Sequence, residues 1–400
     1  MAATDAEIEV ISDETMVINL GPQHPSTHGV LRVRLTLDGE RVVDAEPIIG
    51  YLHTGFEKSA ETLTYQQANT LTDRLDYLAP MTNNLAYVLA VENLMKLEVP
   101  KRAQYIRILF SELTRLASHL VWLGTHVMDL GAMSLFFYCM REREVILDLI
   151  EAASGVRMNP SYFRVGGLAY DLPEGFHEKV WDFVKDFPRW MKAYKNLVYD
   201  NPIMNERLKG ISILGREACY QYGVTGPNLR ATGLALDLRK DEPYCFYDEF
   251  EFDVPTRTEC DAFARFWVRF DEMYESHKIV EQVIEKITPQ GEYATRDRKV
   301  SLPPRHEIYG NMEALIHQFK LVTTGFPVPA GESYQGVEGP RGEMGFYVVS
   351  DGGPKPYRWR ARTPSYYNLQ TMPILAKGGL VADVITAIGS IDIMLGDVDK

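Results

Sequence analysis

The sequence predicts an α+β fold in which a central bundle of long helices lies between two β-rich segments. In residues 16–50, apolar and polar side chains alternate as in strands, and Asp38-Gly39 marks a tight turn. In residues 59–154, apolar side chains instead recur every three or four positions, as on a helix face. From Pro327 onwards the chain is rich in glycine, proline and aromatic residues and again resembles strands.

These changes of pattern divide the chain into four segments. Residues 1–15 are acidic and poor in large apolar side chains, so we expect them to be disordered or extended. Residues 16–58 form a β-rich N-terminal region that carries a candidate site loop, and residues 59–325 form the helical bundle. Residues 326–400 form a C-terminal α/β extension, whose final helix is expected to pack on the N-terminal region.

Several helix ends can be recognised within the bundle. Pro100 separates two helical runs, because proline is favoured in the first turn of a helix, and Gly155 ends a third run. Residues 174–200 and 256–288 are predicted to be two further long helices. Residues 116–140 contain a single formal charge, and we expect a buried helix here because polar residues interrupt the run and arginines flank it.

The composition argues against several classes of protein. A net charge of -13 disfavours a nucleic-acid binder, which needs a basic face to meet phosphates. The four cysteines form no CxxC pair and match no zinc or iron–sulfur spacing, which indicates reduced thiols. The N-terminus lacks the pattern of a signal peptide, and neither a phosphate-binding glycine loop nor a hydrolase motif is present.

The stretch "GPQHPSTHG" at residues 21–29 is the first candidate site, because it places His24 and His28 in a stiff loop. Pro22 and Pro25 restrict the backbone, so the side chains are held in place at a small entropic cost. Histidine suits proton exchange near neutral pH. The alternative is a β-hairpin whose histidines only bond to nearby carbonyls.

Two further stretches are candidates. In "DRLDYLAP", the hydroxyl of Tyr77 could donate to a carbonyl oxygen, or Tyr77 could be an aromatic anchor beside a surface ion pair that involves Arg74. His126 and Asp129 share a helix face, and a carboxylate in an apolar run must be paired, neutralised or functional. The alternative for Asp129 is a structural hydrogen bond. The final "GDVDK" is interpreted as a solvated terminus. A set of His, Tyr, Asp and Arg side chains fits the binding and protonation of a small carbonyl compound.

A series of motifs runs from Met16 to Lys400 in a fixed order: "GPQHPSTHGVLR", "IGYLHTGFEK", "DRLDYLAP", "SELTRLASHL", "REREVILDLIEAASG", "RVGG", "RGEMGFYVVSDGG", "PYRWRARTPSYYNLQ" and "GDVDK". With these motifs the chain resembles the D-subunit family of NADH-quinone oxidoreductase, respiratory complex I. That family is related to the large subunit of nickel–iron hydrogenases, which holds metals with two CxxC pairs. The resemblance therefore implies a hydrogenase-like fold without its metal site.

By this resemblance, the chain helps to form a quinone cavity and supplies proton donors for reduction of the quinone to quinol. His28 and Tyr77 would donate to the two quinone carbonyls, and Asp129 would pair with His28 and return its proton. Oriented donors of this kind stabilise the negative charge that builds up as electrons arrive. The residues expected to line or support the cavity are His24, Ser26, Thr27, Arg74 and Met133.

Thr54 and Asn159 would lie near the terminal iron–sulfur cluster, which the B subunit holds. This chain would supply no ligand to that cluster and would bind no metal or covalent cofactor of its own. Many family members have arginine in the position of Thr54 and histidine in the position of Asn159, so this chain departs from them. The quinone would be menaquinone or ubiquinone.

The resemblance also implies partners and a location. The partners are the B, C and I subunits and the membrane H subunit of a proton-pumping complex, in which NAD(H) is bound elsewhere and no nucleic acid takes part. The chain would be a peripheral protein on the cytoplasmic side of the cell membrane. Two alternatives remain open: the equivalent subunit of a related membrane-bound dehydrogenase with a donor other than NADH, and a purely structural hydrogenase-like assembly subunit. An assembly subunit would not require His28, Tyr77 and Asp129.

Overall fold

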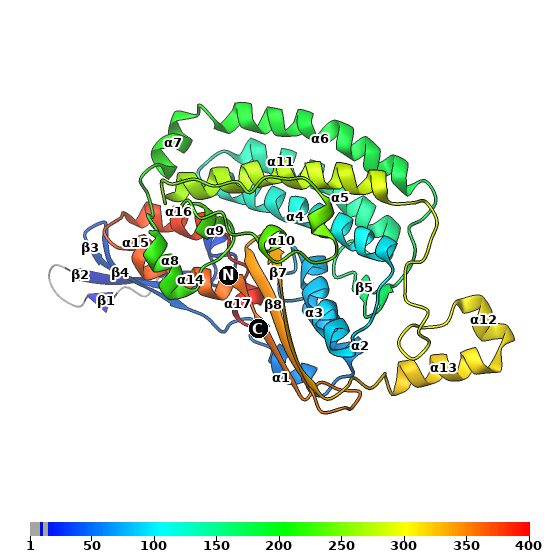
Figure 1. Cartoon of the computed structure of the whole chain (residues 1–400). Coiled ribbons are helices and arrows are strands. Elements are labelled where there is room, and N and C mark those ends of the chain that lie inside the picture. The colour runs from blue at the N-terminus through cyan, green and yellow to red at the C-terminus, as the bar shows by residue number, and fades with distance from the viewer. Residues whose placement is uncertain (1–8, 11–14) are drawn as a thin grey trace, which may run out of the picture.

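The computed structural model describes residues 9–10 and 15–400, which fold into helices and small antiparallel sheets (Figure 1). Long helices form the body, and the N-terminal strands lie to one side together with the last helices of the chain. The α+β fold class predicted from the sequence is confirmed. Of residues 1–15, Glu9–Val10 form a strand and Thr15 begins another, while residues 1–8 and 11–14 lie outside the described residues.

The N-terminal sheet has four antiparallel strands in the order β1-β2-β3-β4. The predicted hairpin is confirmed, since Asp38 pairs with Arg41 and Gly39 has a φ of 58°, which favours glycine. Buried side chains alternate along β3, so one face of the sheet is covered. The strands are β1 (Glu9–Val10), β2 (Thr15–Leu20), β3 (Arg32–Asp38) and β4 (Arg41–Ile48).

Helix α4 is the centre of the body, because α3, α5, α11 and α16 (Val381–Ile391) all pack against it. This burial explains why so much of its sequence is apolar. The predicted helix ends are confirmed: Pro100 is the N-cap of α4, and Gly155 caps α5 with a φ of 83°. The two further helices predicted from the sequence are α6 and α11. The long helices are α3 (Pro80–Met95), α4 (Lys101–Asp129), α5 (Met133–Ser154), α6 (Phe176–Val198) and α11 (Ala262–Lys286).

The prediction that residues 116–140 form one buried helix is wrong. α4 ends at Asp129 and α5 begins at Met133, because Gly131 adopts a φ of 99° that turns the chain back along α4. Most residues before the turn are buried, whereas Met133 and Phe137 after it are 58% and 61% exposed. Within the described residues, no helix is long and apolar enough to cross a membrane.

A cluster of buried charges joins α4 and α11 to residues 230–239, which lie between the two helices in the sequence. The carboxylate of Glu272 contacts the guanidinium groups of Arg115, Arg230 and Arg239 at 3.2, 3.2 and 3.3 Å, and it also contacts His119 at 3.1 Å. Burial opposes its ionisation, but the surrounding cations hold the pKa of Glu272 well below its usual range. Such a network fixes the relative positions of these segments, because removing one member leaves another charge uncompensated.

Shorter elements complete the fold and form a second core. Leu35 of β3 packs in one apolar cluster with Ile388 and Leu395, so the two ends of the chain share this core. β7, β8 and β9 form an antiparallel sheet, and α12 and α13 form a hairpin that stands apart from the body (Figure 1). The remaining elements are α1 (Phe56–Ala60), α2 (Tyr65–Thr72), β5 (Phe163–Arg164), β6 (Gly167–Leu168), α7 (Pro202–Leu208), α8 (Arg216–Tyr222), α9 (Pro227–Arg230), α10 (Leu238–Asp241), α12 (Arg305–Gly310), α13 (Met312–Thr323), β7 (Gly331–Gly339), β8 (Gly342–Ser350), β9 (Arg358–Arg362), α14 (Pro364–Leu369), α15 (Met372–Ala376), α16 (Val381–Ile391) and α17 (Leu395–Val398), with short 3-10 turns at Pro25–Thr27 and Tyr247–Glu249.

Candidate functional site

The loop between β2 and β3 is held in shape by its own hydrogen bonds. The hydroxyl of Thr27, which is fully buried, donates to the carbonyl oxygens of His24 and Pro22 at 2.8 and 3.2 Å. The backbone N–H of Ser26 donates to Nδ1 of His24 at 3.2 Å, which caps the 3-10 turn over residues 25–27. The chain leaves this turn at His28, whose φ is 53°. The loop is therefore internally bonded, and it is not a solvated linker.

Asp129 at the end of α4 meets this loop through Ser26. The Ser26 hydroxyl donates to Oδ1 of Asp129 at 3.3 Å. Burial raises the pKa of the Asp129 carboxyl, and the Ser26 hydrogen bond and the nearby His24 partly offset that rise. The structure thus brings Ser26, His24 and Asp129 together. The expected pairing of Asp129 with His28 is not formed in the described part of the chain, because the turn presents Ser26 to α4 and His28 follows beyond it.

His28 instead lies within the electrostatic reach of two buried charges. Its side chain keeps accessible surface, but the dense protein around it lowers the pKa of the imidazole. Asp392 opposes this shift and Arg341 reinforces it. His28 therefore keeps contact with solvent although protein atoms are dense around it.

Tyr77 lies within the electrostatic reach of the same buried group. It follows α2 and is half-buried, and burial raises the pKa of its phenol, so the hydroxyl stays protonated and able to donate at neutral pH. The neighbouring carboxylate of Asp76 is fixed by Arg341, whose Nη1 donates to it at 2.7 Å. Arg341 also acts on the pKa of Tyr77, as it does on that of His28. The two candidate donors therefore share one buried cation.

Arg341 links three segments that are far apart in the sequence. Its Nη1 also donates to the hydroxyl of Ser118 on α4 at 3.0 Å, and its Nη2 donates to Oδ1 of Asp392 at 3.2 Å. Sequence reasoning missed both Arg341 and Asp392. The signal available for Arg341 was its position between Pro340 and Gly342 in "GPRGEMGF", where a charged residue separates two glycines in a strand-to-strand turn.

The interpretation of "GDVDK" as a solvated terminus is wrong, because this end of the chain is buried. Asp397 is inaccessible to solvent and accepts a hydrogen bond from the backbone N–H of Ser365 at 3.2 Å. Asp399 accepts from the N–H groups of Gly50 and Leu52, both at 2.8 Å. A side chain at Gly396 would come within 2.6 Å of a backbone oxygen of the segment that leads to Tyr77. The C-terminus thus packs directly against the backbone of the segment that leads to Tyr77.

The pKa of Asp397 predicts a pH-dependent terminus. Burial, reinforced by Asp76, raises the pKa of Asp397 to about 7. A carboxyl with a raised pKa in the folded state contributes stability below its unfolded pKa near 3.8 that is lost as pH rises through 7. We expect amide hydrogen exchange in residues 393–400 of the assembled protein to become faster as pH rises from about 4 to 7 and to level off above that range, after correction for intrinsic rates. In Asp397→Asn this step should vanish, and a step that persists would contradict the assignment.

Asn159 lies in the loop after α5, where its backbone has an uncommon positive φ and hydrogen bonds of neighbouring residues hold the loop in place. It has a φ of 53°, and its buried Oδ1 has no hydrogen-bond partner among the described residues. Two residues later, Ser161 donates to Asp73 through both its backbone N–H, at 2.9 Å, and its hydroxyl. Asp73 also accepts from the side-chain amide of Asn84 at 2.6 Å. Thr54 is exposed after His53, whose Nδ1 lies 2.7 Å from the backbone oxygen of Asp399.

The other residues singled out from the sequence are Arg74, Met133 and His126, and each has different surroundings. Arg74 is exposed and donates to the backbone oxygen of Thr70, so the structure does not bring it to the other candidates. Met133 is exposed at the start of α5, four residues after Asp129. His126 is fully buried and stacks on Trp122, with ring centroids 5.7 Å apart. Burial and nearby arginines lower the pKa of His126 to about 3, so it is a neutral core residue.

Two comparisons of the sequence with known proteins identify relatives of this chain. The sequence profile of the family described as "Respiratory-chain NADH dehydrogenase, 49 Kd subunit" matches residues 129–400. The chain is 54% identical over 393 residues to the second D subunit of the NADH-quinone oxidoreductase of Koribacter versatilis (strain Ellin345), covering 98% of each protein. It is 55% identical over 385 residues to the first D subunit of that enzyme in Solibacter usitatus (strain Ellin6076), covering 96% of this chain and 94% of the relative. It is 52% identical to the D subunit of the enzyme in Trichlorobacter lovleyi, covering 97% of this chain and 100% of the relative.

Proposed function

The chain belongs to the family of the 49-kDa, or D, subunit of respiratory-chain NADH dehydrogenase, a subunit of an oxidoreductase complex, and we propose that it forms the quinone site of that complex. In this proposal, Tyr77 and His28 donate to the two carbonyls of a quinone head group while electrons arrive from the terminal iron–sulfur cluster of the B subunit. Oriented donors lower the barrier because they stabilise charge as it develops on the carbonyl oxygens.

The observation that carries this proposal is the shared buried cation. Arg341 acts on both Tyr77 and His28, and it is held in place by Asp76 and Asp392. A rigid charged group that acts on both proton donors supports a fixed arrangement of those donors, as recognition of a two-carbonyl ring requires. The exposed apolar side chain of Met133 is a suitable contact for a quinone ring.

The roles of the supporting residues follow from their contacts. His24, Ser26 and Thr27 shape the loop, and Asp129, which Ser26 holds, is proposed to return protons to the site after each turnover. Arg74 is assigned no direct contact with the quinone, because its side chain is exposed and donates to the backbone oxygen of Thr70 in the preceding helix α2. We also propose that the fold derives from the nickel–iron hydrogenase large subunit without its metals.

The Ser26–Asp129 contact can be separated from the alternative His28–Asp129 pair by double variants. Because Ser26 donates to Asp129, Ser26→Ala and Asp129→Asn should be coupled, and their double variant should be no slower than the worse single variant. His28→Ala combined with Asp129→Asn should instead be additive. Turnover of a short-chain quinone by the assembled complex measures both cycles. Additivity in the first cycle and coupling in the second would restore the pairing with His28.

His28→Ala alone should be milder than loss of the Tyr77 hydroxyl. His28 keeps solvent access, so water can enter the space left by the imidazole and donate in its place. The same assay compares the two variants, and a His28→Ala complex that is slower than a Tyr77→Phe complex would contradict this order.

The departures at Thr54 and Asn159 predict the properties of the neighbouring cluster. A nearby cation or donor favours the reduced cluster and raises its potential, but Thr54 carries no charge and Asn159 does not titrate. We expect a comparatively low potential that changes little between about pH 6 and 8, which suits menaquinone better than ubiquinone. Redox titration by electron paramagnetic resonance measures this. Asn159→His should introduce a pH dependence and Asn159→Gln should not, whereas a steep dependence in the unchanged protein would contradict the prediction.

The complex as a whole requires partners that this chain does not specify. We propose the B, C and I subunits and the membrane H subunit as neighbours, with the chain peripheral on the cytoplasmic side of the membrane. Purification of the intact complex, with extraction of its quinone, tests the proposal. Co-purification of a flavoprotein that oxidises NADH supports it, and its absence would favour a related dehydrogenase with another donor.

A further inference from the structure

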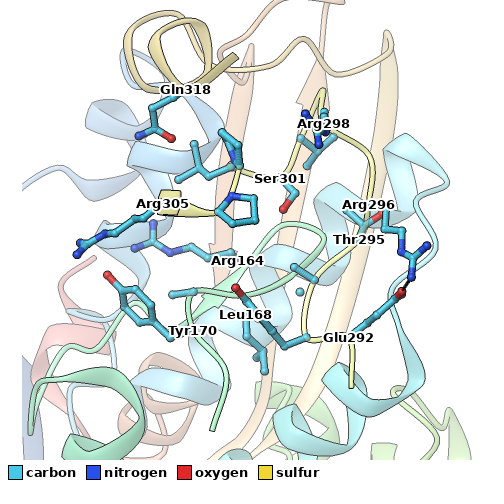
Figure 2. A pocket seen from close by; sticks show the side chains of 18 of the residues that line it. Arg164, Leu168, Tyr170, Glu292, Thr295, Arg296, Arg298, Ser301, Arg305 and Gln318 are labelled. Atoms are coloured by element: carbon cyan, nitrogen blue, oxygen red, sulfur yellow. Dashed lines mark ion pairs between the residues drawn. The ribbon is translucent and has the colours of Figure 1, made fainter. Parts of the chain in front are cut away.

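A wide cavity lies away from the proposed quinone site. Its volume is about 1190 Å³, and its walls come from β5 and β6, the loop over residues 291–304, and the α12–α13 hairpin. Figure 2 shows Arg164, Arg305 and Tyr170 at one end of this cavity, with Gln318 of α13 above them. Residues distant in the sequence thus place two guanidinium groups, a phenol and an amide around one space.

The described residues do not fully compensate the charge of this cavity. Arg298 pairs with Glu307 at 2.8 Å, and Arg296 pairs with Glu292. Among the described residues, the side chains of Arg164 and Arg305 make neither an ion pair nor a hydrogen bond. Four guanidinium groups therefore face two carboxylates in a chain whose net charge is -13. Burial lowers the pKa of Arg164, with Asp73 and Tyr170 in partial opposition, which is the signature of a cation that lacks a close partner.

The hairpin at the rim of the cavity exposes an apolar stripe. Tyr309, which lines the cavity, is 91% exposed, and Phe319 on α13 is 66% exposed. Four other apolar side chains of α13, each three or four positions from another member of the stripe, are also exposed: Met312, Leu315, Ile316 and Val322. A contiguous apolar surface beside uncompensated charge is typical of an interface that a partner covers. The hairpin stands apart from the body in Figure 1, where a second protein can reach it.

We propose that this cavity receives an acidic segment of a neighbouring protein subunit of the same complex. Carboxylates of that segment pair with Arg164 and Arg305, the hydroxyl of Tyr170 and the amide of Gln318 complete the hydrogen bonds, and adjacent apolar side chains of the segment cover the α13 stripe. Guanidinium groups suit this partner because they bind carboxylates through two parallel hydrogen bonds. The site anchors assembly and is independent of quinone chemistry.

Photo-cross-linking in the intact complex tests this proposal. p-Benzoylphenylalanine in place of Gln318 should form an adduct with another subunit of the complex, at a segment rich in Asp and Glu, which mass spectrometry identifies. Each charge-assisted contact is worth about tenfold in affinity, so Arg164→Gln and Arg305→Gln should each lower the adduct yield by about that factor. Arg296→Gln is the matched control, because that guanidinium already has a partner in Glu292, and it should leave the yield unchanged.

The outcomes that overturn the proposal are distinct. These are no adduct, an adduct confined to lipid or to this chain, an adduct with a segment that lacks carboxylates, or an equal yield in the two arginine variants and the control. If the Gln variants do not assemble, Arg164→Lys and Arg305→Lys keep the charge and should retain a measurable adduct. Quinone turnover in assembled variants should stay at the level of the unchanged complex, which separates this site from the proposed quinone site.

Discussion

A complex that carries Tyr77→Phe should assemble normally and lose most of its quinone reductase activity. The substitution removes one hydroxyl with little change in volume, so the hollow that Tyr77 lines with Leu78 and Pro80 keeps its shape. The lost group is a donor to an oxygen on which negative charge develops, and removal of one such donor lowers turnover by about 100- to 1000-fold in other enzymes. Turnover of a short-chain quinone by purified complex measures the effect.

The control for this variant is a tyrosine outside the site. Tyr357→Phe changes a phenol that is 70% exposed on the loop before β9, and it should leave turnover unchanged. Electron transfer from the donor to a hydrophilic artificial acceptor should be the same in both variants. Unchanged quinone turnover in an assembled Tyr77→Phe complex would remove Tyr77 from the site.

Arg341→Gln should be the most destabilising single substitution near the site. It leaves Asp76 and Asp392 without their shared cation, at a position that is 1% exposed. Breaking a buried charged network costs about 3–5 kcal/mol, a large part of the stability of a typical domain. Amide hydrogen exchange in β8 and α17, followed in the assembled complex, measures the effect, since a lower free energy of local unfolding makes the exchange faster. Quinone turnover should fall as well, because Arg341 acts electrostatically on both Tyr77 and His28.

Arg358→Gln is the matched control for Arg341→Gln. Arg358 lies on β9 in an exposed pair with Glu61 at 3.0 Å, and exposed pairs contribute about 0–1 kcal/mol. Exchange in β8 and α17 should therefore stay close to that of the unchanged protein. Equal effects of the two substitutions would show that the buried network around Arg341 does not stabilise this region.

The features predicted correctly from the sequence are those with local causes. The turn at Asp38 and Gly39, the start of α4 at Pro100 and the end of α5 at Gly155 each depend on the conformational preference of one or two residues. The break at Gly131 was missed because apolar composition on both sides suggested a continuous helix. A single glycine with a positive φ was enough to end α4.

The features predicted wrongly depend on contacts between distant residues. The burial of Asp397 arises from Ser365 and from the segment before Tyr77, and no pattern within "GDVDK" indicates either contact. The partner of Asp129 is decided by the direction in which a three-residue turn presents Ser26. Spacing in the sequence indicates which side chains can share a helix face, but it does not indicate which loop will meet that face.

A structure of the intact complex with a quinone bound tests the central claim most directly, through the distance from the hydroxyl oxygen of Tyr77 to the nearer quinone carbonyl oxygen. The proposed site predicts a hydrogen bond, at about 2.6–3.2 Å, with His28 beside the other carbonyl. A reducible quinone head group bound with neither Tyr77 nor His28 within hydrogen-bond reach, directly or through one water, would contradict it.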